Sequence, residues 1–118
     1  MRRLEPARQQ YAWGSTSAIP ELLGVADDGA PWAEAWYGSH PAGPARVTGG
    51  DALSELIDAE PERLLGEDII WRFGRRLPFL LKLIAPERPL SLQVHPSQAQ
   101  AAEGYALEEE AGIALDHP

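Results

Sequence analysis

The segment from Pro89 to His95 alternates apolar and polar side chains residue by residue. The apolar positions are Leu90, Leu92 and Val94, and the polar positions are Ser91, Gln93 and His95. Because successive side chains of a β-strand point to opposite faces, this alternation predicts a strand with one apolar and one polar face. The hydrophobic share of 44%, with 24% charged residues, also predicts a packed core.

A second strand is predicted just before it, over Leu77–Ile84. Both side-chain parities are apolar there apart from Lys82, as expected for a strand buried on both faces or in a barrel wall. Burying an ammonium group without a partner anion is costly. Two interpretations stay open: a phosphate or carboxylate ligand neutralises Lys82, or Lys82 lies at an edge with its stem packed and its charge in water.

The remaining elements are shorter. Tyr11–Ser15 predicts a strand that runs into a turn, followed by a loop, and Trp32–Ser39 predicts a second strand with Glu34 and Trp36 on one face. A helix is predicted through Leu53, Leu56 and Ile57, with Thr48 and Asp51 as candidate N-caps. Further helices should run from Pro61 to Gly66 and from Ser97, in a capping box with Gln100, to Gly112.

Composition limits the class of protein. The 118 residues make one domain or part of one, and a net charge of −8 argues against nucleic acid or an anionic membrane as a partner. With no cysteine, neither a disulfide framework nor a thiolate metal site is available. The most apolar stretch is far too short to span a membrane, and the N-terminus lacks the apolar run of a signal peptide, so we expect a cytoplasmic location.

The polar face of the Pro89–His95 strand is the strongest candidate site. Side chains two apart on a strand lie about 6.5 to 7 Å apart, close enough to share one ion. Imidazole suits zinc, whereas a glutamine amide is a weak ligand that zinc seldom selects. From spacing alone, a polar face turned to solvent is the simpler interpretation, and half of a metal site is the alternative.

Three other residues invite a functional interpretation. Glu34 lies between Trp32 and Trp36, where a carboxylate is either a functional group or simply exposed, and the pattern favours exposure. His40, in a turn before Pro41, is expected to bond to backbone, and His117 is too near the chain end to be given a role. The sequence contains no phosphate-binding loop or dinucleotide fingerprint.

Taken together, the motifs resemble type I mannose-6-phosphate isomerases over nearly the whole chain. The similar stretches are Gln10–Ser15, then Ala33, Glu34, Trp36, Gly38, His40 and Pro41, then Leu77–Ile84, the highly specific Pro89–Pro96, and finally Gly104–Ala106 with Ala111–Ile113. Ala35 and Tyr37 depart from the longer aliphatic residues common in that family, but neither is an expected ligand.

The resemblance implies a mainly β, cupin-type fold, a double-stranded β-helix barrel with helical additions. It also implies that residues 1–118 are the N-terminal part of the catalytic domain, so that the barrel is incomplete in this chain. The family holds Zn²⁺ with one Gln, one Glu and two His, so Gln93 and His95 are implied as metal ligands. The remaining Glu and His of the family lie beyond Pro118.

The implied reaction interconverts mannose 6-phosphate and fructose 6-phosphate through a cis-enediol, a step of carbohydrate metabolism leading toward GDP-mannose. Lys82 and Glu34 are then the implied catalytic residues, and Ser91 and Lys82 the implied substrate-binding residues. One alternative is a non-catalytic cupin module that binds a sugar or a metal. Another is a truncated product without independent function, because half a barrel leaves unpaired strand edges.

Overall fold

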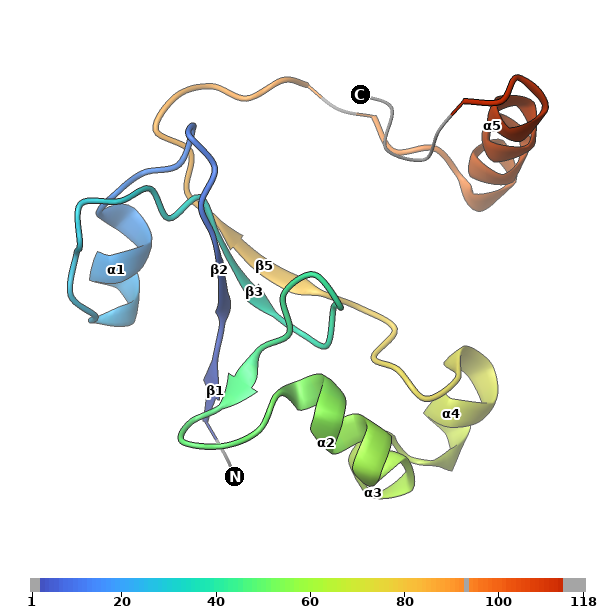
Figure 1. Cartoon of the computed structure of the whole chain (residues 1–118), viewed down its shortest axis with the longest axis horizontal. Coiled ribbons are helices and arrows are strands. Elements are labelled where there is room, and N and C mark those ends of the chain that lie inside the picture. Colours follow the sequence, from blue (N-terminus) through green and yellow to red (C-terminus); the bar gives the residue numbers. More distant parts are fainter. Residues whose placement is uncertain (1–2, 93, 114–118) are drawn as a thin grey trace.

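The computed structural model describes residues 3–92 and 94–113. Within them the chain forms two small antiparallel sheets accompanied by helices (Figure 1). The strands are β1 (Leu4–Glu5), β2 (Ala7–Gln9), β3 (Glu34–Tyr37), β4 (Arg46–Val47) and β5 (Leu81–Ile84). The helices are α1 (Ala18–Leu23), α2 (Leu53–Ala59), α3 (Pro61–Leu65), α4 (Glu67–Phe73) and α5 (Gln98–Glu110).

The three-stranded sheet has the order β2-β3-β5, and β1 pairs with β4 in a separate ribbon. Strand β3 is central, so both of its edges are hydrogen-bonded. Its register sets Trp36 opposite Ala7 on one side and opposite Lys82 on the other. Directly opposed residues of antiparallel strands project to the same face, so Trp36 and Lys82 share a face of the sheet.

The core is small and rich in alanine. Its buried apolar residues are Ile19, Ala33, Ala35, Trp36, Ala45, Ala52 and Ile57. Short side chains let chain segments approach closely: a Cβ placed on Gly14 would lie 2.5 Å from both Cα and Cβ of Ala33. The glycine after Trp13 is therefore required by packing.

The strand predicted over Tyr11–Ser15 is wrong. This segment is a turn, closed by a 2.9 Å hydrogen bond from the Gly14 N–H to the Tyr11 carbonyl, and Gly14 makes only an isolated bridge to Pro86. Buried Ser15 then accepts a hydrogen bond from the Ala18 N–H at 3.3 Å. This bond satisfies the first N–H of helix α1, whose N-cap is Ser17, in a region predicted to be a loop.

Several local predictions are confirmed with narrower bounds. The strand expected over Trp32–Ser39 is β3, the helix expected from Pro61 is α3, and the helix expected from Ser97 is α5. Ser97 and Gln100 form the predicted capping box. At α2, however, Ala52 is the N-cap rather than Thr48 or Asp51, and its N–H donates to the Glu55 carboxylate at 2.9 Å. Helix α4 was not foreseen.

The structure differs from the strand predictions for Leu77–Ile84 and Pro89–His95. Leu77–Ile84 forms a strand only over β5, and that strand is largely exposed instead of buried on both faces. Pro89–His95 forms no strand among its described residues. The reason is shared: in the described part of the chain β5 is an edge strand, and no neighbour pairs with the segment that follows it.

The molecule is open. Its radius of gyration is 17.4 Å, against about 13.5 Å for a compact chain of this length. Its accessible surface is 9003 Å², against about 6,300 Å² for a compact monomer of this mass. Helix α5 stands apart from the sheet (Figure 1). No helix in the described part of the chain combines the length and apolar character needed to cross a bilayer.

Candidate functional site

Three side chains meet on one face of the central sheet, and we call them the charge cluster: Glu34, Trp36 and Lys82. The Lys82 Nζ lies 3.4 Å from Oε2 of Glu34. The Trp36 indole N–H donates a 2.5 Å hydrogen bond to the same oxygen. The ammonium also lies over the Trp36 ring, 4.4 Å from a ring centroid. Each member therefore contacts both others.

Burial decides between the interpretations left open by the sequence. The Glu34 side chain is only 12% exposed, so the expected solvent exposure of this carboxylate is wrong. The Lys82 side chain is 36% exposed and lies on an edge strand. Its charge is met by the carboxylate of Glu34 within the protein, which was not foreseen. Opposite charges in two apolar strands were the available signal, but their pairing depends on register.

Such a cluster can take part in proton chemistry. A carboxylate accepts hydrogen bonds and an ammonium donates them, and contacts of charged groups strengthen when water is partly excluded. A hydroxylated or phosphorylated ligand placed against Lys82 and Glu34 would meet a donor and an acceptor together. The arrangement suits a polar substrate that exchanges a proton.

His40 behaves as the sequence predicted. The Ala42 N–H donates to its Nδ1 at 3.1 Å, so this ring nitrogen is an acceptor tied to the local turn. The imidazole also meets the Trp36 ring edge to face, with centroids 5.0 Å apart at an interplanar angle of 78°. His40 therefore supports the charge cluster from the side.

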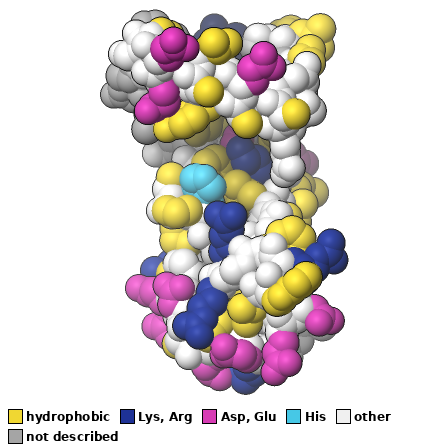
Figure 2. All heavy atoms as spheres, turned by 90° about the vertical axis from the view of Figure 1, so that its right-hand side faces the viewer, with side chains coloured by type: hydrophobic (Ala, Val, Ile, Leu, Met, Phe, Trp, Pro, Cys, Tyr) yellow, Lys and Arg dark blue, Asp and Glu magenta, His cyan; other side chains and the backbone are white. Residues whose placement is uncertain are grey.

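A cavity of about 590 Å³ opens beyond His40. Its lining residues are Ser39, His40, Pro41, Phe73, Arg76, Leu77, Pro78, Phe79, Leu80 and Gln98. Figure 2 shows a hollow at the waist of the molecule, between α5 above and the α2–α4 region below, with histidine and Lys or Arg side chains along it. Glu34 and Lys82 are not among the lining residues, so the cavity and the charge cluster are separate features.

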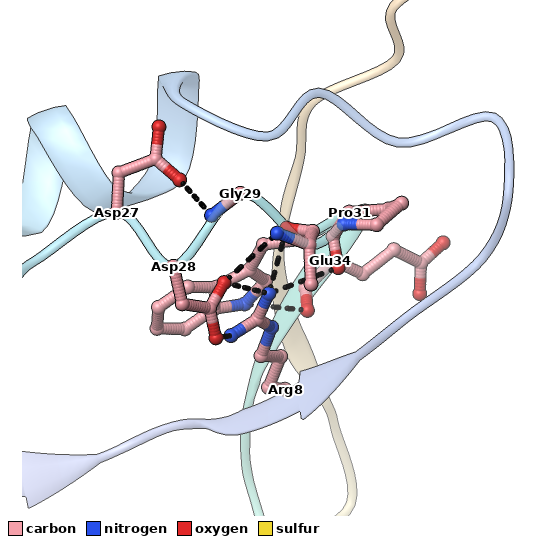
Figure 3. A network of polar contacts seen from close by, with 8 residues as sticks. Arg8, Asp27, Asp28, Gly29, Pro31 and Glu34 are labelled. Atoms are coloured by element: carbon pink, nitrogen blue, oxygen red, sulfur yellow. Dashed lines mark hydrogen bonds and ion pairs between the residues drawn. The ribbon is translucent and has the colours of Figure 1, made fainter.

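A second polar network braces the loop that enters β3 (Figure 3). Arg8 donates to both carboxylate oxygens of Asp28, at 2.7 and 2.9 Å, and to the carbonyls of Ala30 and Pro31. Its guanidinium lies 5.0 Å from the centroid of a Trp32 ring. The hydrogen bond from Arg8, helped by the Ala30 N–H, lowers the pKa of Asp28 to about 2. Sequence reasoning missed this brace, because Arg8 carried no local motif.

The predicted metal ligands are not assembled by the described residues. Gln93 lies outside them, so its predicted role is untested. His95 and Ser91 are exposed, on the stretch between β5 and α5. Across residues 3–92 and 94–113, no group of three or more His, Cys, Asp or Glu side chains is arranged to hold a metal.

Comparison with known proteins supplies the missing context. The family model described as phosphomannose isomerase type I, catalytic domain, matches residues 1–116. Mannose-6-phosphate isomerase of Escherichia coli (strain K12) is 42% identical over 121 residues, which cover 98% of this chain and 31% of that protein. The Homo sapiens mannose-6-phosphate isomerase is 39% identical over 111 residues, covering 83% of this chain and 26% of that protein.

Solved structures agree. The crystal structure of mannose 6-phosphate isomerase from Salmonella typhimurium bound to substrate (f6p) and zinc superposes with a TM-score of 0.86 at 42% identity. That match covers 99% of this chain and 30% of the other. The chain thus spans under a third of the length of the bacterial and human relatives and of the crystallised enzyme.

The agreement confirms the fold class expected from the sequence, a cupin-type fold with helical additions. Its barrel is not closed within the described residues, which form only small antiparallel sheets. The family match extends over almost every residue, and identity near 40% recurs in bacterial and human relatives. The chain belongs to the type I phosphomannose isomerase family.

Proposed function

We propose that residues 1–118 form the N-terminal part of a cupin-type catalytic domain that interconverts mannose 6-phosphate and fructose 6-phosphate. The observation that carries the proposal is the charge cluster, in which a mostly buried carboxylate pairs with a partly exposed ammonium on one sheet face. The family match supplies the reaction class. Of the relatives, one is crystallised with f6p and zinc, the ligands this proposal assigns.

The charge cluster suits this reaction chemically. Aldose–ketose isomerisation moves a proton between C1 and C2 of the open-chain sugar through a cis-enediol, whose oxygens become negative. In the proposal the Lys82 ammonium donates to a sugar or phosphate oxygen, and the Glu34 carboxylate accepts a hydrogen bond from a sugar hydroxyl. Ser91 is proposed to contact the substrate as well. These contacts orient the sugar and offset its charge.

Zinc is the proposed cofactor, with Gln93 and His95 as two of its ligands. The exposed imidazole of His95 is a suitable zinc donor. In the proposal the other ligands come from outside the described residues, among which no group of three His, Cys, Asp or Glu side chains is arranged to hold a metal. Zinc bound there supplies positive charge for the developing enediolate oxygens.

Zinc content and isomerase turnover of the purified 118-residue chain test the proposal together. Chelator treatment and a Gln93→Ala/His95→Ala double variant should abolish both if this chain completes a site with a partner. His117→Ala is the matched control, because that histidine lies outside the family motifs. Turnover that survives the double variant and the chelator would contradict the metal assignment.

A non-catalytic cupin module is the second candidate. It is compatible with the described residues, which bring no group of three metal-ligating side chains together. Binding of mannose 6-phosphate without turnover, in the presence of zinc, would identify this alternative. Turnover above the Glu34→Gln background would exclude it.

The proposed partner is a small molecule, a hexose 6-phosphate, and neither a nucleic acid nor a membrane. A phosphorylated sugar does not cross a bilayer unaided, so we also propose the cytoplasm as the compartment. Phosphatase-sensitive binding, lost when mannose replaces mannose 6-phosphate, would support the assignment of a phosphorylated ligand.

A further inference from the structure

Trp36 contacts both charges of the cluster with two different parts of one ring system. Its indole N–H donates to Oε2 of Glu34, and its π face lies under the Lys82 ammonium at 4.4 Å. Indole is the best of the aromatic rings for a cation, and its N–H is a donor only. One side chain therefore supplies the contact that each charge prefers.

The indole is itself held rigidly. Trp36 is 7% exposed and lies on β3, which is hydrogen-bonded on both edges. The His40 ring packs against it edge to face. On the loop after β3, a Cβ placed on Gly43 would come within 3.5 Å of the Trp36 ring. The ring is thus clamped between the sheet and the turn.

The side chains of Glu34 and Lys82 are more flexible than the Trp36 ring. Lysine has a flexible four-carbon stem, and glutamate has three rotatable bonds. Both the indole N–H and the ammonium converge on Oε2 of Glu34. Among the described residues no side-chain hydrogen bond reaches the other oxygen, Oε1. That oxygen is left to accept from a ligand.

We propose that Trp36 is a positioning residue, whose N–H and ring face hold Glu34 and Lys82 in the one arrangement that presents Oε1 and the ammonium to the sugar phosphate. The inference rests on the proposed function for the identity of the ligand. The geometric part, that Trp36 holds Lys82, stands on the contacts alone.

The sequence makes this testable, because Lys82 is the only lysine in the chain. Trace acylation followed by mass spectrometry reports its reactivity directly, with the N-terminal amine as internal reference. Trp36→Leu removes both contacts, and Trp36→Phe keeps a ring face but removes the N–H. Trp71→Leu is the matched control, because Trp71 is exposed on α4.

Freed of the ring, the Lys82 amine should acylate about tenfold faster in Trp36→Leu, and only about twofold faster in Trp36→Phe. Trp71→Leu should label at the wild-type rate. Wild-type rates in both Trp36 variants would overturn the proposal.

A second measurement covers the case in which Trp36→Leu fails to fold. Reductive methylation with ¹³C-formaldehyde keeps the charge on Lys82 and gives it one lysine methyl signal in the NMR spectrum. In the wild-type chain and in Trp36→Phe, this signal should shift upfield because the methyl groups lie over an aromatic ring. A signal at the free-lysine position in the folded wild-type chain would overturn the proposal.

Mannose 6-phosphate separates the positioning role from the proposed function. If mannose 6-phosphate slows the acylation of Lys82 in the wild type and in Trp36→Phe, but not in Trp36→Leu, both the positioning role and the proposed function are supported. Equal protection in all three overturns the positioning role and leaves the proposed function in place. Protection in none contradicts the proposed function, and the methyl signal then decides whether Trp36 holds Lys82.

Discussion

The central sheet and the stretch from Pro89 to α5 differ sharply in how much of their environment this chain provides. In the sheet, Ala35 and Trp36 are buried and the charges of Glu34 and Lys82 are paired. In the later stretch, Leu92 and Val94 are 97% and 90% exposed, and α5 buries none of its residues against the rest of the described chain.

The difference shows that a sequence motif can identify a family without forming regular structure by itself. Pro89–Pro96 is the most specific family motif, yet its described residues form no strand. A strand satisfies its backbone only through neighbours, and hydrophobic burial needs a second surface. The charge cluster, in contrast, needs only β3, β5 and the turn after β3.

Adding one methyl group near the sheet and one in α5 should test the contrast between these two regions most strongly. Gly14→Ala places a Cβ 2.5 Å from backbone and side-chain atoms of Ala33, so the backbone around Ala33, just before the central strand β3, must shift. We expect a loss of about 3 kcal/mol in the free energy of unfolding. Urea titration followed by tryptophan fluorescence measures it.

The same substitution in α5 is the matched control. A Cβ placed on Gly104 would have no neighbouring atom within 4 Å. Gly104→Ala should therefore stabilise the helix by about 0.5 to 1 kcal/mol, because alanine favours helix over glycine. A loss of stability at Gly104 would mean that α5 is packed against something, and the contrast between the regions would fail.

Removing the cation of the charge cluster should have the next largest effect. Lys82→Met keeps the apolar stem but leaves the nearly buried Glu34 carboxylate without its ammonium. The expected loss is about 1.5 kcal/mol in the free energy of unfolding, from the same titration. In Arg63→Met the lost partner is Glu60, and both side chains are more than half exposed, so a much smaller loss than in Lys82→Met is expected. Equal losses would show that burial of Glu34 adds nothing.

Loss of the α5 N-cap should act only locally. The Ser97 hydroxyl accepts from the Gln100 N–H, and Ser97→Ala should cost the helix about 1 kcal/mol. Because α5 is not packed on the sheet, amide hydrogen exchange should accelerate in α5 and stay unchanged in β3. Faster exchange in both would indicate that the two regions unfold as one unit.

Acid should break the contact between Arg8 and Asp28 that braces the loop before β3. This is the smallest of the expected effects. Asp28 has its pKa lowered from 3.8 to about 2 by Arg8. A lowered folded-state pKa means that the stabilisation is present above about pH 4 and is lost as the pH falls toward 2. The Trp32 indole NMR signal should move over this range in the wild type and not in Asp28→Asn. The α5 amide signals provide the internal reference.

Local signals in the sequence predicted much of the fold. Ser97 with Gln100 predicted the start of α5, Pro61 and Gly66 bounded α3, and the aromatic run around Trp36 predicted β3. These succeed because caps, proline and strand propensity act within a few residues. Family motifs predicted the fold class, which the comparisons confirmed.

The sequence by itself determined the family, the positions of most helices and which residues to consider for catalysis, substrate binding and metal binding. Only the tertiary structure decided that Glu34 is mostly shielded from solvent, that it neutralises Lys82, and that Trp36 joins them. The physical reason is register: residues 34 and 82 are far apart in sequence and meet only when β3 and β5 pair as observed. For the same reason the described residues of Pro89–His95 form no strand, because pairing is a property of neighbours and not of the segment.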